Sequence, residues 1–202
     1  MKIICIGRNY VEHARELNNE VPTDPVFFMK PDTALLREGQ AFYIPSFSDD
    51  IHYEAELVLK VCKEGKNILE EFAYRYYDQV TVGIDFTARD VQQRQKEKGL
   101  PWEPAKAFDG SAAVGQFIPI KNATDATLPF SLDLNGTRKQ EGATSLMIFS
   151  FDKIIAFVSR YVTLRKGDLV FTGTPKGVGK VTGGDTIACF LEKEEVLKLE
   201  IR

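Results

Sequence analysis

Short apolar runs bounded by Gly, Pro, Asn or Asp recur along the whole chain and limit its fold more than any other feature of the sequence. Runs of this length with these boundaries are typical of β-strands. They predict strands over residues 2–6, 41–44, 55–61, 80–86, 128–135, 168–171, 186–190 and 195–201. Because the runs do not alternate regularly with helical segments, the sequence predicts a β-rich α+β fold rather than a doubly wound parallel sheet.

Helical patterns are fewer than strand patterns. They predict helices over residues 10–17, from residues 68–71 onward, over residues 88–98 and over residues 150–164. Ser150 is the expected N-cap of the last helix, which carries a broad apolar stripe. Before the third helix, Thr87 and Asp90 resemble a capping box, and Gly99 supplies the stop signal.

Composition restricts the class of protein. The chain has 202 residues, of which 44% are hydrophobic and 27% are charged, as in an ordinary soluble globular protein. No repeat, low-complexity segment or linker divides it, so we expect one domain over residues 1–202, which can bury roughly 70% of the unfolded chain's surface. The net charge of −3, without a basic run or basic residues interleaved with aromatic ones, argues against nucleic-acid binding.

The N-terminus and the cysteines indicate the cellular compartment. Only four apolar residues precede Gly7 and Arg8, too few for the core of a signal peptide or for a membrane span. Cys5, Cys62 and Cys189 lie next to apolar residues and show no paired metal-binding spacing. Their odd number also favours reduced thiols in the core over disulfides or a zinc site. We therefore expect a cytoplasmic protein that contacts no membrane.

Two glutamates share one face of a predicted strand. In "DIHYEAELVLKV", residues 50–61, His52, Glu54 and Glu56 alternate with a continuous apolar face, because successive side chains of a strand point to opposite sides. A solvated polar face is the simpler explanation of the glutamates. Asp85 is harder to explain, because it ends the apolar run "VTVGID", where an ionised group is costly unless it is paired or bound to a metal.

Carboxylates from two strands can converge on one point, since residues two apart on one strand face lie only roughly 6.5 Å apart. A divalent cation would turn the repulsion among Glu54, Glu56 and Asp85 into attraction. Three oxygen ligands suit Mg²⁺ or Mn²⁺, and the set contains no cysteine that would favour zinc. These three residues are therefore the candidate metal ligands.

The glycine-rich segment "TGTPKGVGK" is similar to a phosphate-binding loop, but its spacing fails. Thr174 stands where the first glycine is required, and Val181 stands where serine or threonine is required. The segment instead predicts a turn whose backbone N–H groups and Thr174 hydroxyl can bind a carboxylate. A plain β-turn is the alternative.

Four motifs occur in an order that resembles the fumarylacetoacetate hydrolase family: "HYEAEL", "GIDFTARDVQ", "KAFDGSAAVG" and "FTGTPKGVG". The N-terminal "GRNYVEHARE" makes the chain most similar to the short members, of the acylpyruvase and oxaloacetate decarboxylase type. The resemblance covers essentially the whole chain. It implies a mixed β-roll of layered sheets, a homodimer, and a Mg²⁺ or Mn²⁺ site held by Glu54, Glu56 and Asp85, with His52 structural or behind the ligands.

The resemblance also implies roles for further residues. His13 and Glu16, three apart on the first predicted helix, would activate water, although an exposed helix face is the alternative explanation. Lys106, in the apolar setting "PAKAF", would contact an anionic substrate and stabilise an oxyanion or enolate. The remaining candidates for substrate binding are Gln92, Gly173 and Thr174, together with Arg8 and Tyr10, which lie between the first strand and His13.

The expected reaction is the metal-dependent hydrolysis of a C–C bond in an acylpyruvate, a small anionic 2,4-dioxo acid, with release of pyruvate. Decarboxylation of oxaloacetate and isomerisation or hydration of 2-hydroxyhepta-2,4-diene-1,7-dioate would pass through similar enol chemistry and remain alternatives. A non-catalytic β-domain that binds a small acid is the alternative from another class. Residues 18–25 resemble a flexible connection that would let the first helix act as a lid.

Overall fold

The computed structural model describes residues 1–16, 20–36, 39–120 and 127–202. Its largest sheet contains β2 (Val26–Lys30), β1 (Ile3–Gly7), β11 (Leu169–Phe171), β4 (Ala55–Val61), β5 (Tyr77–Asp85) and β7 (Ala112–Val114), in this order, with β8 (Ile118–Pro119) also paired with β5. Strands β1 and β11 are parallel, and the other pairs of this sheet are antiparallel.

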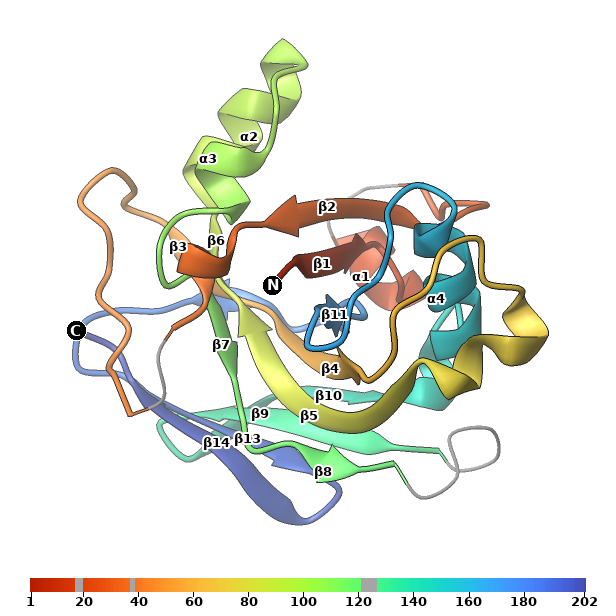
Figure 1. Cartoon of the computed structure of the whole chain (residues 1–202). Helices are drawn as coiled ribbons and strands as arrows, with labels where there is room; N and C mark the ends of the chain where they lie inside the picture. The colour runs from red at the N-terminus through yellow and green to blue at the C-terminus, as the bar shows by residue number, and fades with distance from the viewer. Residues whose placement is uncertain (17–19, 37–38, 121–126) are drawn as a thin grey trace.

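Two smaller sheets complete the architecture. One contains β10 (Thr137–Ala143), β9 (Pro129–Leu134), β13 (Thr186–Leu191) and β14 (Glu194–Glu200), and the other contains β12 (Gly179–Lys180), β3 (Ile51–Tyr53) and β6 (Thr87–Ala88). The four-stranded sheet forms a second layer below β4 and β5 in the view of Figure 1. Layered, mixed sheets with few helices confirm the fold class expected from the sequence.

The two faces of the large sheet pack against different apolar clusters. Leu57 of β4 belongs to the main core, which also contains Leu132 of the four-stranded sheet. Val58, the next residue, belongs to a smaller cluster with Phe171. Glu56 lies two residues before Val58 and therefore points to the side of the smaller cluster, because strand side chains alternate between faces. This side of the sheet carries the candidate site.

Helices are short and lie around the sheets (Figure 1). They are α1 (Val11–Glu16), α2 (Arg89–Lys98), α3 (Glu103–Lys106) and α4 (Phe151–Ser159), with the 3₁₀ helices η1 (Asp32–Ala34), η2 (Glu70–Arg75) and η3 (Thr144–Leu146). Ser150 caps α4 as predicted, since its hydroxyl accepts a hydrogen bond from the backbone N–H of Lys153 at 3.2 Å. Gly99 ends α2 in the left-handed conformation, with φ of 63°.

The capping box predicted for α2 is wrong. Thr87 lies in β6, and the helix begins at Arg89 after Ala88, which offers no side-chain cap. The Thr87 hydroxyl is used elsewhere, because it accepts a hydrogen bond from the buried Nζ of Lys106 at 2.6 Å. The hydroxyl that the sequence predicts as a helix cap is thus bonded to a buried ammonium group instead.

Other boundaries also differ from the sequence prediction. The segment 50–61 is not one strand: it divides at Glu54, because β3 pairs with β6 and β12 whereas β4 pairs with β5 and β11. Residues 41–44 form only an isolated bridge between Phe42 and Ile201. The helix predicted from residues 68–71 onward is the 3₁₀ helix η2, and α4 ends at Ser159 rather than at residue 164.

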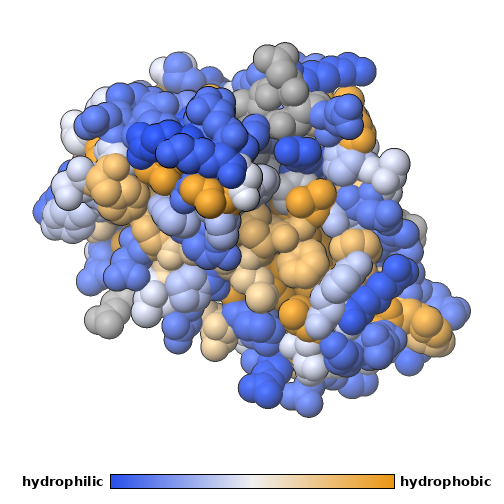
Figure 2. Space-filling model, turned by 90° about the horizontal axis from the view of Figure 1, so that it is seen from above, coloured by the Kyte–Doolittle hydropathy of each residue, from blue (hydrophilic) through white to orange (hydrophobic). Residues whose placement is uncertain are grey.

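Residues 17–19 lie outside the described part of the chain, so the end of the helix predicted over residues 10–17 and the start of the connection over residues 18–25 fall there. None of the helices in the described ranges has both the length and the apolar character needed to cross a membrane. Seen from above, the molecule has apolar residues near the middle of its face and hydrophilic residues around them (Figure 2).

All three cysteines are free thiols, as the sequence predicts. Cys5 and Cys189 are fully buried, whereas Cys62 is partly exposed and is therefore not the core thiol that the sequence suggested. Its neighbours in sequence are Val61 on one side and Lys63 on the other, so the local pattern predicts neither a buried nor an exposed thiol.

Candidate active site

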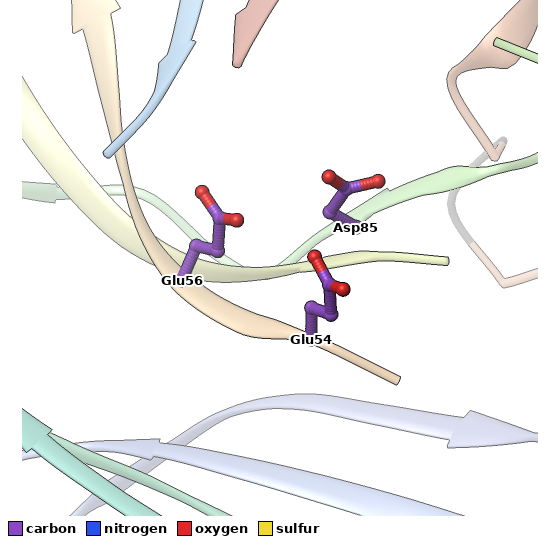
Figure 3. A group of neighbouring side chains, drawn as sticks. All are labelled: Glu54, Glu56 and Asp85. Carbon is purple, nitrogen blue, oxygen red and sulfur yellow. The ribbon is translucent and has the colours of Figure 1, made fainter. Parts of the chain in front are cut away.

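Three carboxylates converge on one point, as the sequence predicts (Figure 3). One oxygen atom each of Glu54, Glu56 and Asp85 lies within 4.8 Å of the others, and all three residues are buried. Glu54 occupies the break between β3 and β4, Glu56 lies on β4, and Asp85 ends β5. The backbone N–H of Asp85 donates to the carbonyl oxygen of Glu54 at 2.9 Å, so strand pairing fixes the two side chains beside each other.

Two buried lysines neutralise part of this negative charge. The ammonium group of Lys106, at the end of α3, donates to Glu54 Oε2 at 2.7 Å, to Asp85 Oδ2 at 2.8 Å and to Thr87 Oγ1 at 2.6 Å. Lys30, at the end of β2, contacts Asp85 Oδ1 at 2.7 Å. The three donors of Lys106 are thus used within the protein in this arrangement, and the substrate contact predicted for Lys106 stays a prediction.

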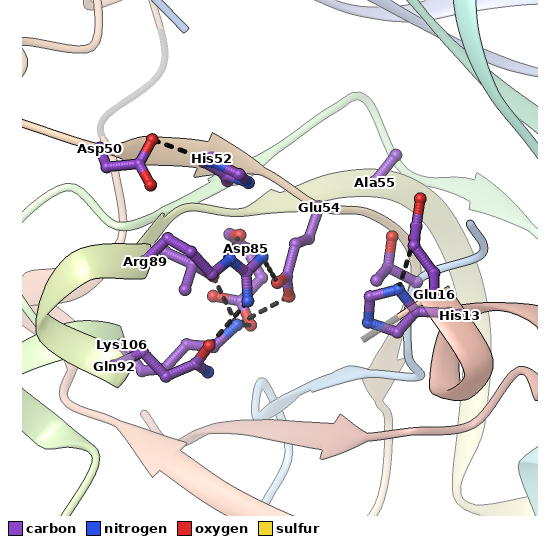
Figure 4. Close-up of polar contacts among 12 residues, drawn as sticks. His13, Glu16, Asp50, His52, Glu54, Ala55, Asp85, Arg89, Gln92 and Lys106 are labelled. Carbon is purple, nitrogen blue, oxygen red and sulfur yellow. Dashed lines mark hydrogen bonds and ion pairs between the residues drawn. The ribbon is translucent and has the colours of Figure 1, made fainter. Parts of the chain in front are cut away.

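Arg89 adds a third cation at the start of α2. It donates to Glu54 Oε1 at 2.5 Å and to Gln92 Oε1 at 2.7 Å (Figure 4). Gln92 therefore lies at the site, as the sequence predicts. Sequence reasoning missed both Arg89 and Lys30; the available signals were the position of Arg89 four residues after Asp85 and the lysine that directly follows an apolar run in "VFFMK".

The three carboxylates differ in electrostatic environment. Burial raises the pKa of Glu56, and the negative charges of Asp85 and Glu54 raise it further. Burial also opposes ionisation of Glu54, but the charges of Lys106 and Arg89 outweigh burial and hold the pKa of Glu54 well below its usual range. The only polar partner that the described residues give Glu56 is the backbone N–H of Gly173, at 2.7 Å from Oε2.

The donor set fits a divalent cation. Glu54, Glu56 and Asp85 supply three hard oxygen ligands, and hard oxygen ligands are those that Mg²⁺ and Mn²⁺ prefer. A buried carboxylate without a cationic partner is costly. Among the described residues Glu56 lacks such a partner, and a bound divalent cation would supply it. The triad can therefore hold a divalent metal ion.

His13 and Glu16 form the pair expected from the sequence. His13 Nδ1 lies 3.2 Å from Glu16 Oε2, and His13 is 5% exposed. Because a carboxylate only accepts hydrogen bonds, Nδ1 is the protonated nitrogen and Nε2 is left as the basic one. The backbone N–H of Gly177 donates to Glu16 Oε1 at 3.0 Å and holds the carboxylate in place.

One pocket joins these groups. It is a small cavity of about 50 Å³ that opens to solvent on one side. Its wall includes the three carboxylates together with His13, Lys106 and Thr174. In the view of Figure 4, the His13–Glu16 pair lies on one side of Glu54, and Arg89 and Gln92 lie on the other.

The glycine-rich turn has two functions in this geometry. Gly173 has a φ of 102°, and a Cβ atom there would lie 2.6 Å from Cβ of Asn9, so no other residue fits. Its N–H donates to the protein's own Glu56, whereas the sequence predicted a bond to a substrate carboxylate. The neighbouring Thr174 lines the pocket, and its predicted contact with a substrate carboxylate stays a prediction.

Gln140 of β10 is a buried residue that sequence reasoning missed. Its Oε1 accepts from the backbone N–H of Ala55 at 2.9 Å, and its Nε2 donates to Thr174 Oγ1 and to the carbonyl oxygen of Pro175, each at 2.9 Å. The side chain therefore ties the residue between the two glutamates to the glycine-rich turn. The amide orientation follows from these partners, because a backbone N–H needs an acceptor and a carbonyl needs a donor.

The remaining candidates have different positions. Arg8 lines the pocket. Tyr10 does not: it is 3% exposed in the main core, and its hydroxyl lies 3.4 Å from the carbonyl oxygen of Ala143, so a structural role replaces the substrate contact expected from the sequence. His52 lies 3.1 Å from Asp50 and outside the pocket wall, which agrees with the structural role expected for it.

Comparison with known proteins gives a consistent result. The profile described as fumarylacetoacetate (FAA) hydrolase C-terminal matches residues 2–202. "Oxaloacetate tautomerase FAHD1, mitochondrial" of Bos taurus is 44% identical over 186 residues, which cover 92% of this chain and 84% of that protein. "Oxaloacetate decarboxylase, mitochondrial" of Dictyostelium discoideum is 42% identical over 192 residues, which cover 93% of this chain and 87% of that protein.

A solved structure extends the similarity to the fold. Fumarylpyruvate hydrolase from Pseudomonas aeruginosa, in complex with Mn²⁺ and pyruvate, superposes with a TM-score of 0.93 at 36% identity. The match covers 100% of this chain and 89% of the other. The matching profile, the curated relatives and the shared fold together show that the chain belongs to the fumarylacetoacetate hydrolase family.

Proposed function

We propose that this chain is a divalent-metal-dependent enzyme of short 2-oxo acids and that its main reaction is the interconversion of the keto and enol forms of oxaloacetate. The observation that carries the proposal is a single pocket in which a buried three-carboxylate cluster faces a basic histidine. The names of the Bos taurus and Dictyostelium relatives, both of which act on oxaloacetate, support this substrate.

Glu54, Glu56 and Asp85 would hold the metal ion. When bound, Mg²⁺ or Mn²⁺ supplies Lewis-acid stabilisation of negative charge on the oxygen atoms of a 2-oxo acid. Lys106 adds a fixed positive charge beside the same cluster, since burial disfavours its charged form but Asp85 and Glu54 outweigh burial and raise its pKa. Its charge would favour an enolate without a direct contact.

His13 is the proposed proton acceptor. Glu16 fixes its Nδ1–H, so Nε2 can accept a proton from C3 of the keto form and deliver it to the C2 oxygen, which gives the enol; the reverse transfer restores the keto form. The hydroxyl of Thr174 would orient the substrate carboxylate. The pocket lies on the face of the large sheet that also carries the smaller apolar cluster.

Hydrolysis of acylpyruvates is the second candidate. The His13–Glu16 pair, held by the N–H of Gly177, can also take a proton from water that attacks the distal carbonyl. C–C cleavage would then release pyruvate as its enolate. The similarity to a fumarylpyruvate hydrolase supports this reaction. Decarboxylation of oxaloacetate would use the same enolate stabilisation without activated water.

The test is a substrate panel with metal-stripped protein, with and without added Mg²⁺ or Mn²⁺. Keto–enol exchange of oxaloacetate is followed by ultraviolet absorbance, and pyruvate release from oxaloacetate and acylpyruvates is followed by a coupled assay. We expect metal-dependent exchange to be fastest, and His13→Ala to reduce it at least 100-fold. Glu56→Gln should remove every activity. Glu64→Gln is its matched control, because Glu64 is exposed and lies outside the site.

Metal binding without turnover of any substrate would instead identify a non-catalytic acid-binding domain. Metal-dependent pyruvate release from acylpyruvates that exceeds oxaloacetate exchange would favour the second candidate over the first.

A further inference from the structure

We propose that Arg8 and Lys96 form a second anion-binding subsite in the same pocket and that this subsite selects substrates with two carboxylates. The inference rests on the proposed function, because it places the second carboxylate of a short 2-oxo acid. It concerns two residues that lie outside the carboxylate cluster and outside the His13–Glu16 pair.

The described residues of the pocket wall include more cationic than acidic side chains. Among the described residues of its wall, the cations are Arg8, Arg89, Lys96 and Lys106, and the carboxylates are Glu54, Glu56 and Asp85. Arg89 and Lys106 are held by the carboxylates themselves, through the contacts to Glu54 and Asp85. A divalent cation bound by the three carboxylates would leave the pocket with an excess of positive charge. A dianionic ligand balances this excess better than a monoanionic one.

Arg8 is held at the pocket in an unusual conformation. Its φ of 60° lies in the left-handed region, which is uncommon and strained for a residue other than glycine. The next residue, Asn9, is fully buried and fixes the segment through hydrogen bonds with Phe149 and Thr172. The guanidinium group of Arg8 makes no hydrogen bond or ion pair with the residues that the structure describes, although it lines the pocket.

Lys96 reaches the pocket from α2. Arg89, Gln92 and Lys96 follow one another at spacings of three and four residues, which places them on one face of the helix. With a rise of roughly 1.5 Å per residue, Lys96 begins roughly 10 Å farther along the helix than Arg89. This face of α2 therefore extends from the carboxylate cluster toward Arg8.

Arg8, Arg89 and Lys96 are close enough to repel one another. Burial lowers the pKa of Lys96, and the charges of Arg8 and Arg89 lower it further. Like charges that converge in a pocket are stabilised by an anion placed among them. Oxaloacetate carries such a group: with its C1 carboxylate and 2-oxo group at the end of the pocket formed by Glu54, Glu56 and Asp85, its C4 carboxylate would extend toward Arg8 and Lys96. An acylpyruvate with an alkyl tail lacks this second charge.

A matched pair of inert ligands tests the subsite apart from catalysis. Malate and 2-hydroxybutyrate differ in the distal carboxylate, and their dissociation constants are measured by calorimetry on Mn²⁺-loaded protein. We expect wild type to bind malate more tightly. Lys96→Met and Arg8→Gln should each weaken malate binding at least tenfold and change 2-hydroxybutyrate binding less than twofold. Lys96→Arg should restore malate binding to within about threefold, because it keeps the charge.

Lys98→Met is the control, since Lys98 lies on the same helix two residues farther on but outside the wall of the pocket. Equal affinity of wild type for the two ligands, or equal weakening of both ligands in the variants, would overturn the subsite. The KM for oxaloacetate should rise at least tenfold in Lys96→Met while kcat changes less. Protein that binds malate selectively but does not convert oxaloacetate would retain the subsite and refute the proposed function instead.

Discussion

Lys30 has a fully buried side chain whose ammonium group contacts Asp85 Oδ1 at 2.7 Å and the carbonyl oxygen of Ser111 at 2.9 Å. Removing one partner of a buried ion pair leaves the other charge uncompensated. We expect Lys30→Met to lower the free energy of unfolding of the metal-free protein by about 3–5 kcal/mol in urea titrations. Lys153→Met, which removes a partly exposed lysine, is the control. A loss below about 1 kcal/mol for Lys30→Met, the range of exposed ion pairs, would contradict the contact.

Glu56 should respond differently to substitution, because the described residues give it no cationic partner and burial raises its pKa. Glu56→Gln removes the cost of burying its negative charge, so we expect no loss of thermal stability in the metal-free protein. The stabilisation by metal should disappear. At a Mn²⁺ concentration 100 times the dissociation constant, the free energy of unfolding of wild type should rise by about 2.7 kcal/mol. An equal Mn²⁺-induced rise in melting temperature for Glu56→Gln and wild type would refute the ligand assignment.

Sequence alone could identify the carboxylates but not all the charges that surround them. Glu54, Glu56 and Asp85 stand out because acidic residues interrupt apolar strands. The local signals of Lys30 and Arg89 are weaker, since these residues join the site only through the pairing of β2 with β1 and the start of α2 at the end of β6. Contacts between distant segments decide which cation meets which carboxylate.

At the level of elements, local patterns located seven of the fourteen strands in the described residues but not their partners. The broken strand at Glu54 illustrates the reason: side-chain alternation continues through the break, while the pairing changes from one sheet to another. Strand β10 was missed because its residues are mostly polar. The "NG" pair at Asn135 and Gly136, both with positive φ, was an available hairpin signal between β9 and β10.

Gln140 connects β10 with β4 and with the glycine-rich turn, so its substitution should disturb all three. Gln140→Met removes the acceptor for Ala55 N–H and the donor for Pro175 O, which leaves buried backbone groups unpaired. We expect a loss of about 2 kcal/mol or more in the free energy of unfolding. Gln93→Met, at an exposed position of α2, should have little effect in the same urea titration. Similar unfolding midpoints for the two variants would exclude the connecting role.

At the level of the whole molecule, the site is assembled from segments far apart in the chain. The end of β1, helix α1, strands β4 and β5, helices α2 and α3 and the glycine-rich turn all contribute to one pocket. No single segment can therefore bind metal or substrate, and loss of the fold should abolish both. The proposed metal site requires the three carboxylates to act together on one cation.

Calorimetric titration of metal-free protein with Mn²⁺ tests this dependence most directly. We expect one Mn²⁺ ion per chain in wild type, displaced by excess Mg²⁺, and binding weakened at least 100-fold in both Asp85→Asn and Glu56→Gln. Absence of saturable binding in wild type, or unchanged affinity in both variants, would contradict the account.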